Sequence, residues 1–193
     1  MKKLSLFLSI ICAAVLTTGC INNKAIQTLN DSAKALMEKG DSQGAVCRLE
    51  SSLELDSTRY ETRYNLGVAY ISLNNLESAK ENLEQVIKMK PDFSDAYYSL
   101  GVVHENLAYN ILNKIAQIAL DNEVQSEESE TLLSDEEKEQ AINELNEAIK
   151  YYNSYVEQSS DKEGVEEVQN QIGNIQKTIE KYKEQNAEAA SEE

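Results

Sequence analysis

The sequence is poor in residues that break helices and in residues that build catalytic centres. It has 1 proline and 7 glycines in 193 residues, which excludes a turn-rich β protein, a collagen-like chain and a low-complexity linker. Tryptophan is absent and histidine occurs once, at His104. Because no glycine-rich phosphate loop, nucleophile elbow or zinc-ligand spacing occurs either, we predict that the chain is not an enzyme and binds no cofactor or metal.

Positive charge is also scarce. The sequence has 18 Lys and Arg against 34 Asp and Glu, a formal net charge of −16. Since nucleic-acid binding requires basic side chains that neutralise phosphates, nucleic acid is not an expected partner. Hydrophobic residues nevertheless make up 41% of the chain, enough for a folded protein with an apolar core.

The chain begins with the three parts of a secretory signal peptide. Two lysines follow Met1, residues 4–16 are largely apolar, and small residues lead to Cys20. The apolar run would rise only about 20 Å as a helix, which is too short for a bilayer core of about 30 Å. The end of the run resembles the lipobox of bacterial lipoproteins: Gly19 and Cys20 fit, whereas Thr17 stands where leucine is usual.

This resemblance implies that residues 1–20 are a lipoprotein signal peptide and that Cys20 carries palmitate-type acyl chains. The protein would then be lipid-anchored to a bacterial membrane, facing the periplasm or the cell exterior. Simple secretion with a spare thiol is the alternative. In the lipidated form Cys47 is the one remaining free thiol, so no intramolecular disulfide is expected.

A 34-residue period runs through the middle of the sequence. Gly67 and Gly101 lie 34 residues apart within similar strings, YNLGV and YSLGV, and Ala45 and Ala79 keep the same spacing. The length and the pattern resemble the tetratricopeptide repeat, a helix–turn–helix unit. The resemblance implies that the small residues lie where paired helices approach closely, so a larger side chain at either glycine would overpack the pair.

The resemblance places three repeat units over residues 26–159. Residues 60–93 match the signature best, and residues 26–59 are a weaker copy. In the third unit Ala141 occurs 28 residues later than the period predicts from Ala79, so an insertion is expected at about 109–136. We therefore predict an all-α fold of three helix pairs, the third with a long helical insertion, followed by a C-terminal capping helix.

Apolar spacing and capping signals give bounds for the third unit. The spacing predicts that its first helix runs over residues 94–121. Residues 122–133 carry several carboxylates and are predicted to form an exposed loop. A capping-box pattern at Ser134 predicts a returning helix that ends at about Ser159.

The predicted C-terminal helix spans residues 160–185, and residues 186–193 are predicted to be a disordered tail. Apolar residues follow one another in this helix at alternating steps of three and four, the spacing of a coiled-coil seam. They are Val165, Val168, Ile172, Ile175, Ile179 and Tyr182. Two interpretations are open: a helix that caps the array, or a coiled coil that joins two chains.

The tetratricopeptide resemblance also implies a concave face, formed by the first helix of each pair, that binds a peptide or a partner helix. The residues expected to point into this groove are Asn30, Lys34, Met37, Tyr64, Val68, Ile71, Tyr98 and Val102. Some members of the family hold a C-terminal carboxylate with Lys, Arg and Asn side chains. Only Lys34 and Asn65 correspond to that set here, so we expect an apolar and aromatic groove instead.

Taken together, these features predict a membrane-anchored scaffold or adaptor that binds a protein partner in the cell envelope. A short tether over residues 21–25 would hold the array close to the membrane. In class it resembles the repeat lipoproteins that assist the assembly of envelope complexes. The alternative is a structural spacer subunit whose groove is filled by its own insertion.

Overall fold

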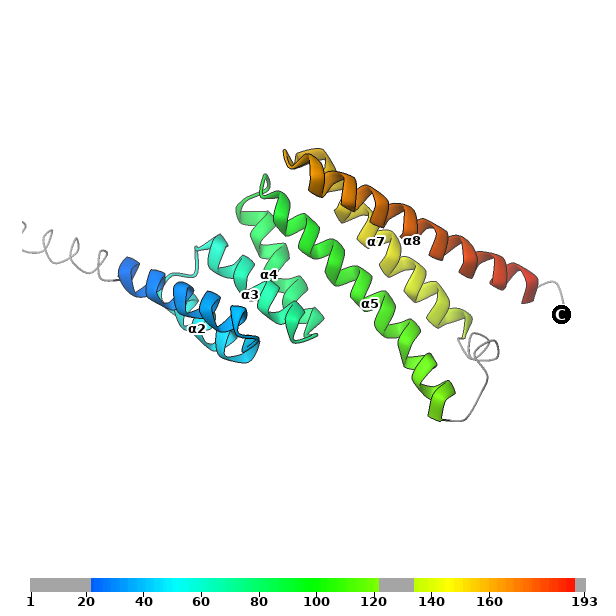
Figure 1. Cartoon of the computed structure of the whole chain (residues 1–193), viewed down its shortest axis with the longest axis horizontal. Helices are drawn as coiled ribbons and strands as arrows, with labels where there is room; N and C mark the ends of the chain where they lie inside the picture. The colour runs from blue at the N-terminus through cyan, green and yellow to red at the C-terminus, as the bar shows by residue number, and fades with distance from the viewer. Residues whose placement is uncertain (1–21, 122–133, 190–193) are drawn as a thin grey trace, which may run out of the picture. The chain divides into compact units, whose positions relative to one another are not determined.

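The computed structural model describes residues 22–121 and 134–189, and within these ranges the chain is helical and contains no strand (Figure 1). This confirms the predicted all-α class. The signal peptide, Cys20 and the loop at 122–133 lie outside the described residues. The chain falls into two compact units that meet between Asn82 and Leu83, within α4 (Leu76–Met89).

The first unit contains a helix over residues 22–38, followed by α2 (Ser42–Leu55), α3 (Tyr60–Ser72) and the first half of α4. Small and large apolar side chains from its first three helices form one core, as expected for closely paired helices. The fully buried members are Ala33, Ala45, Val46, Leu49, Leu66 and Ala69.

The turns of the first two repeats are copies of each other at a distance of 34 residues. Gly40 and Asn74 both have positive φ, at 80° and 53°, the left-handed conformation that glycine and asparagine adopt most readily. The next residue caps the following helix: Asp41 Oδ1 accepts from Gly44 N at 2.8 Å, and Asn75 Oδ1 accepts from Ser78 N at 3.4 Å. The repeat period read from the side chains is therefore present in the backbone.

The first helix begins earlier than the sequence predicted. Residues 22–25, expected to be part of a tether, already belong to the helix. Arg59 Nη2 donates a hydrogen bond to Asn23 Oδ1, and Thr28 Oγ1 donates to the carbonyl of Lys24 at 2.9 Å. These bonds hold the first turn in place, so the predicted tether at 21–25 is too long.

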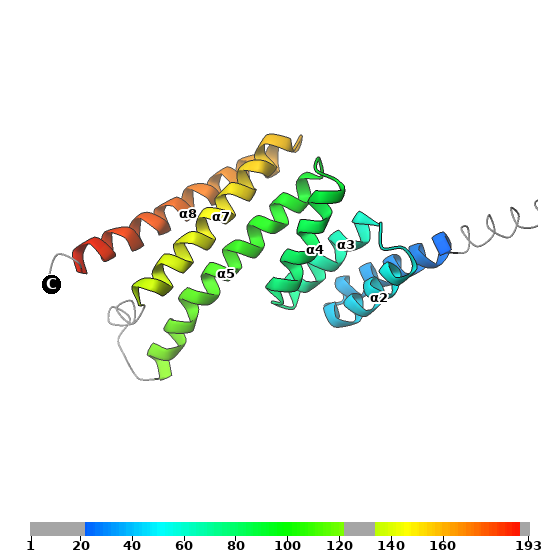
Figure 2. The same cartoon turned by 180° about the vertical axis from the view of Figure 1, so that it is seen from behind.

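The second unit contains three long helices: α5 (Ser94–Asp121), α7 (Asp135–Gln158) and α8 (Lys162–Ala189). In both views α7 lies between α5 and α8 (Figures 1 and 2). α5 has the predicted bounds, and α7 begins at the predicted capping box, in which Ser134 and Glu137 bond each other's backbone N–H groups.

The apolar seam of α8 packs inside this unit, because Val168, Ile172, Ile175 and Ile179 are buried with Leu145 of α7. The capping interpretation of α8 therefore accounts for the seam. The helix ends at Ala189, four residues beyond the predicted end at 185. Residues 186–189 contain two alanines and a glutamate, which are good helix formers.

Candidate binding surface

Six of the eight predicted groove residues lie in the first unit, and none of the six is fully buried. Lys34 is exposed, and Tyr64, Val68 and Ile71 are half-buried on α3. Met37 is also half-buried and packs against the core of the unit. The first helices of the two repeats thus present both charged and apolar atoms on the predicted face.

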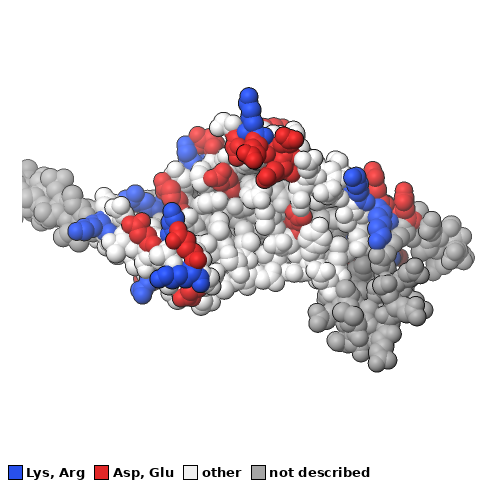
Figure 3. All heavy atoms as spheres, viewed as in Figure 1, with Lys and Arg blue, Asp and Glu red and all other residues white. Residues whose placement is uncertain are grey.

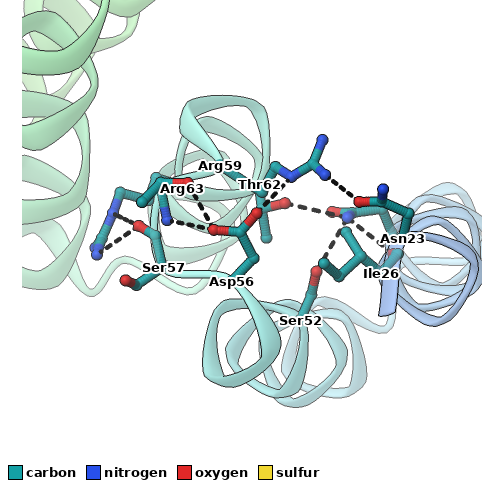
Figure 4. A network of polar contacts seen from close by, with 10 residues as sticks. Asn23, Ile26, Ser52, Asp56, Ser57, Arg59, Thr62 and Arg63 are labelled. Carbon is teal, nitrogen blue, oxygen red and sulfur yellow. Dashed lines mark hydrogen bonds and ion pairs between the residues drawn. The ribbon is translucent and has the colours of Figure 1, made fainter. Parts of the chain in front are cut away.

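Asn30, the sixth of these residues, has a packing role that the sequence did not indicate. Its Nδ2 lies 3.0 Å from the carbonyl of Ile26, 3.1 Å from Ser52 Oγ and 3.1 Å from Thr62 Oγ1 (Figure 4). Ser52 and Thr62 are buried on α2 and α3, so one amide connects three helices. Asn30 Oδ1 is buried without a hydrogen-bond partner among the described residues.

A surface hollow of about 440 Å³ opens between the start of the first helix and the start of α3. Amide groups and one guanidinium dominate its lining, which suits hydrogen bonds to a peptide main chain. The lining residues are Asn23, Ile26, Gln27, Asn30, Arg59, Glu61, Thr62 and Asn65. Of these, only Asn30 was among the predicted groove residues. The three- and four-residue steps between Asn23 and Asn30 place the lining residues of the first helix on one helix face, a spacing that the sequence already contained.

Arg59 is held at the edge of this hollow by two partners. Its Nε donates to Asp56 Oδ2 at 2.9 Å, and Nη2 donates to Asn23 Oδ1 (Figure 4). Hydrogen bonds from Thr58, and then the neighbouring Arg59, keep the pKa of the Asp56 carboxyl below its usual value. The carboxylate therefore stays ionised and fixes the guanidinium beside the hollow.

The last two predicted groove residues, Tyr98 and Val102, lie on α5 in the second unit. Val102 is half-buried and packs against the α5–α7–α8 core, so the chain's own helices cover part of the face predicted to be open. Tyr98 remains 44% exposed. Its ring centroid lies 5.8 Å from that of Tyr152 and 5.6 Å from that of Tyr155.

His104 has a structural environment. Its ring is buried, Nδ1 lies 2.7 Å from Glu144 Oε2, and the ring stacks on Tyr151 with centroids 5.3 Å apart. These contacts join α5 to α7. No group of three or more metal-ligating side chains occurs in the described part of the chain, and the described helices include none long and apolar enough to cross a bilayer.

Glu105 is a buried carboxylate that ties the three long helices together. It accepts hydrogen bonds from Tyr152 Oη of α7, at 2.7 Å, and from Gln171 Nε2 of α8. Burial, and then the Glu105 carboxylate, raise the pKa of Tyr152 above its usual 10.0, and the same two causes raise that of Tyr109. Sequence reasoning missed this network, because its members are 47 and 66 residues apart.

The raised pKa of Tyr152 predicts a loss of stability in alkali. Below pH 10 the Tyr152 phenol is neutral in the folded and in the unfolded state, so its ionisation does not lower the free energy of unfolding. Above pH 10 the unfolded phenol ionises while the folded one does not, so stability falls by about 1.4 kcal/mol per pH unit until the folded pKa is reached. Urea unfolding of the wild type between pH 8 and pH 11 measures this fall, and Tyr152→Phe is expected to reduce it. An equally steep fall in the variant would contradict the assignment.

Comparison with known proteins agrees with this geometry over part of the chain. Residues 36–101 match the tetratricopeptide repeat family. Over 66 residues the chain is 30% identical to the tetratricopeptide repeat and J domain-containing co-chaperone DNJ1 of Cryptococcus neoformans, which is 34% of this chain and 13% of that protein. The chain therefore spans only a small part of that relative.

Solved structures are similar over a larger share of the chain. The first tetratricopeptide domain of Spaghetti (RPAP3) bound to the HSP90 peptide SRMEEVD is 14% identical, with a TM-score of 0.56, and the match covers 81% of this chain and 94% of that one. The same domain of human RPAP3 is also 14% identical, with a TM-score of 0.56, and the match covers 82% of this chain and 95% of that one. A protein from Bacteroides ovatus is 12% identical, with a TM-score of 0.51, and the match covers 80% of this chain and 74% of that one.

The paired helices, the turns repeated after 34 residues and these similarities agree on the architecture. At this level of identity the solved structures bear on the fold. The chain is an all-α protein built on tetratricopeptide-type helix pairs.

Proposed function

We propose that this chain is a scaffold that binds a segment of another protein through the first unit. The observation that carries the proposal is the face made by the first helix and α3. Its apolar residues Val68 and Ile71 are incompletely buried, and an amide-rich hollow adjoins the start of both helices. Apolar side chains of a partner would pack on Val68 and Ile71, and the main chain of the partner would hydrogen-bond to the amide groups of the hollow.

The mode of binding differs from the carboxylate grip known in some relatives. The RPAP3 domain of similar fold is bound to an HSP90 peptide ending in aspartate. In this chain Lys34 and Asn65 are the only residues that correspond to such a grip, and Glu61, which lines the hollow, adds a negative charge beside the face. An internal peptide segment therefore suits this face better than an acidic C-terminus.

A substitution on α3 tests the binding face. Val68→Arg is expected to weaken binding of the native partner at least about tenfold, because it places a bulky charge where an apolar contact forms. Cys47→Arg is the matched control, since Cys47 is exposed on α2. The measurement is partner capture from cell-envelope extract, with circular dichroism of both variants. Equal capture by wild type and Val68→Arg would contradict the proposal.

The second part of the proposal is that acyl chains on Cys20 anchor this scaffold to a bacterial membrane. It rests on the signal-like residues 1–20 and on Gly19–Cys20. More than one acyl chain gives stable anchoring, at about 0.8 kcal/mol per buried CH₂. The helix that begins at residue 22 would then hold the scaffold within a few residues of the anchor.

Cys20→Ser is expected to move the protein from the membrane fraction to the soluble fraction or to leave an unprocessed precursor. Fractionation of cells expressing wild type and variant, with metabolic labelling by a palmitate analogue, measures both lipidation and location. Cys47→Ser is the control for labelling at the other thiol. An unchanged, detergent-dependent membrane pool of Cys20→Ser would contradict the anchor.

The alternative function is a structural spacer whose groove is filled by the chain's own insertion, although the core against which Val102 packs consists of residues outside 109–136. It predicts that Tyr98 variants leave all partner binding unchanged.

A further inference from the structure

Tyr98 is an exposed aromatic ring on a rigid support. It is 44% exposed, whereas Tyr152 and Tyr155 behind it are 1% and 8% exposed. The Tyr98 ring is tilted against each of the other two, at centroid distances of 5.8 Å from Tyr152 and 5.6 Å from Tyr155, the range of favourable aromatic pairs. One ring face or edge is therefore fixed at the surface by two buried neighbours.

Two exposed carboxylates occur near the helix positions that carry this aromatic group. Asp95 is exposed on α5, three residues before Tyr98 and hence on the same side of the helix. On the other side, a Cβ placed at Gly164 would lie 2.5 Å from Tyr155 Oη and 2.7 Å from Asp161 Oδ2. The Asp161 carboxylate and the Tyr155 phenol therefore both lie beside Gly164, at the start of α8.

The surrounding surface has the same sign of charge. Asp161 and the neighbouring acids Glu157, Glu163, Glu166 and Glu167 are all exposed. None of them takes part in the ion pairs found between described residues. Acidic atoms gather over the turn between α7 and α8, with a basic side chain among them (Figure 3). This end of the second unit carries unbalanced negative charge.

An exposed aromatic ring on an acidic surface fits one chemistry well. A guanidinium stacks on an aromatic face, is attracted by its quadrupole and forms paired hydrogen bonds to carboxylates. We propose that Tyr98, Asp95 and Asp161 form a docking site for arginine side chains of a basic segment in a protein partner. This inference rests on the proposed scaffold function and specifies the chemistry of the partner.

Direct binding of a defined peptide tests the site. The probe is a fluorescein-labelled dodecapeptide with four arginines separated by glycine and serine, compared with the same peptide carrying glutamine. The protein is the purified full-length chain, and fluorescence anisotropy is measured at 50 and 150 mM NaCl. The arginine peptide is expected to bind at least about tenfold more tightly than the glutamine peptide. Equal affinity of the two peptides, or binding of neither, would overturn the proposal.

Variants separate a docking site from general attraction between opposite charges. Tyr98→Ala is expected to weaken binding about fivefold, whereas Tyr98→Phe keeps the ring and changes binding less than twofold. Asp95→Asn with Asp161→Asn is expected to weaken binding and to reduce its salt dependence. Both aspartates are exposed, so this variant tests the site even where Tyr98→Ala disturbs the fold.

Matched controls lie on the same helices. Tyr109→Ala removes another exposed tyrosine of α5, and Glu139→Gln with Glu180→Gln removes two exposed charges from α7 and α8. Both controls are expected to change binding less than twofold. An equal loss in the controls would overturn the docking site. A docking site that fails while Val68→Arg still abolishes partner capture would leave the scaffold function intact, so the two proposals fail independently.

Discussion

Replacing Tyr152 with alanine is expected to lower the free energy of unfolding by about 3–5 kcal/mol. The ring is 1% exposed, packs among the three long helices and donates a hydrogen bond to the buried Glu105. The substitution leaves a cavity and removes a donor from a buried carboxylate, and both effects destabilise the folded state. For a protein of this size the melting temperature should fall by about 2–4 °C for each kcal/mol.

Tyr152→Phe isolates the polar part of this effect. It keeps the ring and removes only the donated hydrogen bond, so a smaller loss of about 1–3 kcal/mol is expected. Urea unfolding followed by circular dichroism measures both variants. A wild-type unfolding midpoint for Tyr152→Ala would contradict the packing of α7 described above.

Gly101→Ala is expected to lower the free energy of unfolding by about 1–3 kcal/mol. A Cβ at position 101 would lie 2.4 Å from Cε1 of Tyr152, closer than any real side-chain contact. Because that ring is buried, it has little room to move aside. The small residue that the repeat signature requires at this position thus has a physical cause, the approach of α7 to α5.

The pair Gly101 and Tyr152 allows a stricter test. If the cost of Gly101→Ala comes from this clash, it should largely disappear in a protein that already carries Tyr152→Ala. A double-mutant cycle measures the coupling. Additive losses would show that the glycine is required for another reason.

The features that sequence reasoning recovered are local or periodic. The capping box at Ser134 and the apolar spacing along 94–121 depend on residues within one or two helical turns, so the bounds of α5 and the start of α7 could be predicted. The 34-residue period identified the helix pairs and the close approach at Gly101 for the same reason, since repeats copy their packing positions.

The features that sequence reasoning missed depend on distant residues. The partners of Glu105 come from two other helices, 47 and 66 residues away. Asn30 was predicted to face a partner, yet its amide bonds Ser52 and Thr62. A polar side chain at a groove position can either contact a partner or hydrogen-bond to neighbouring helices. The sequence does not distinguish these two roles, because the second depends on how the helices pack.

The face of the first helix and α3 is expected to bind a protein partner. Site-specific photocrosslinking tests it most directly, with a photoreactive amino acid placed in turn at Lys34, Val68 and, as a control, the exposed Arg48 of α2. Irradiated cells are analysed for adducts, and mass spectrometry identifies the protein attached. We expect one partner to be crosslinked from positions 34 and 68 and not from 48. Adducts of equal yield from all three positions, or from position 48 alone, would contradict the account.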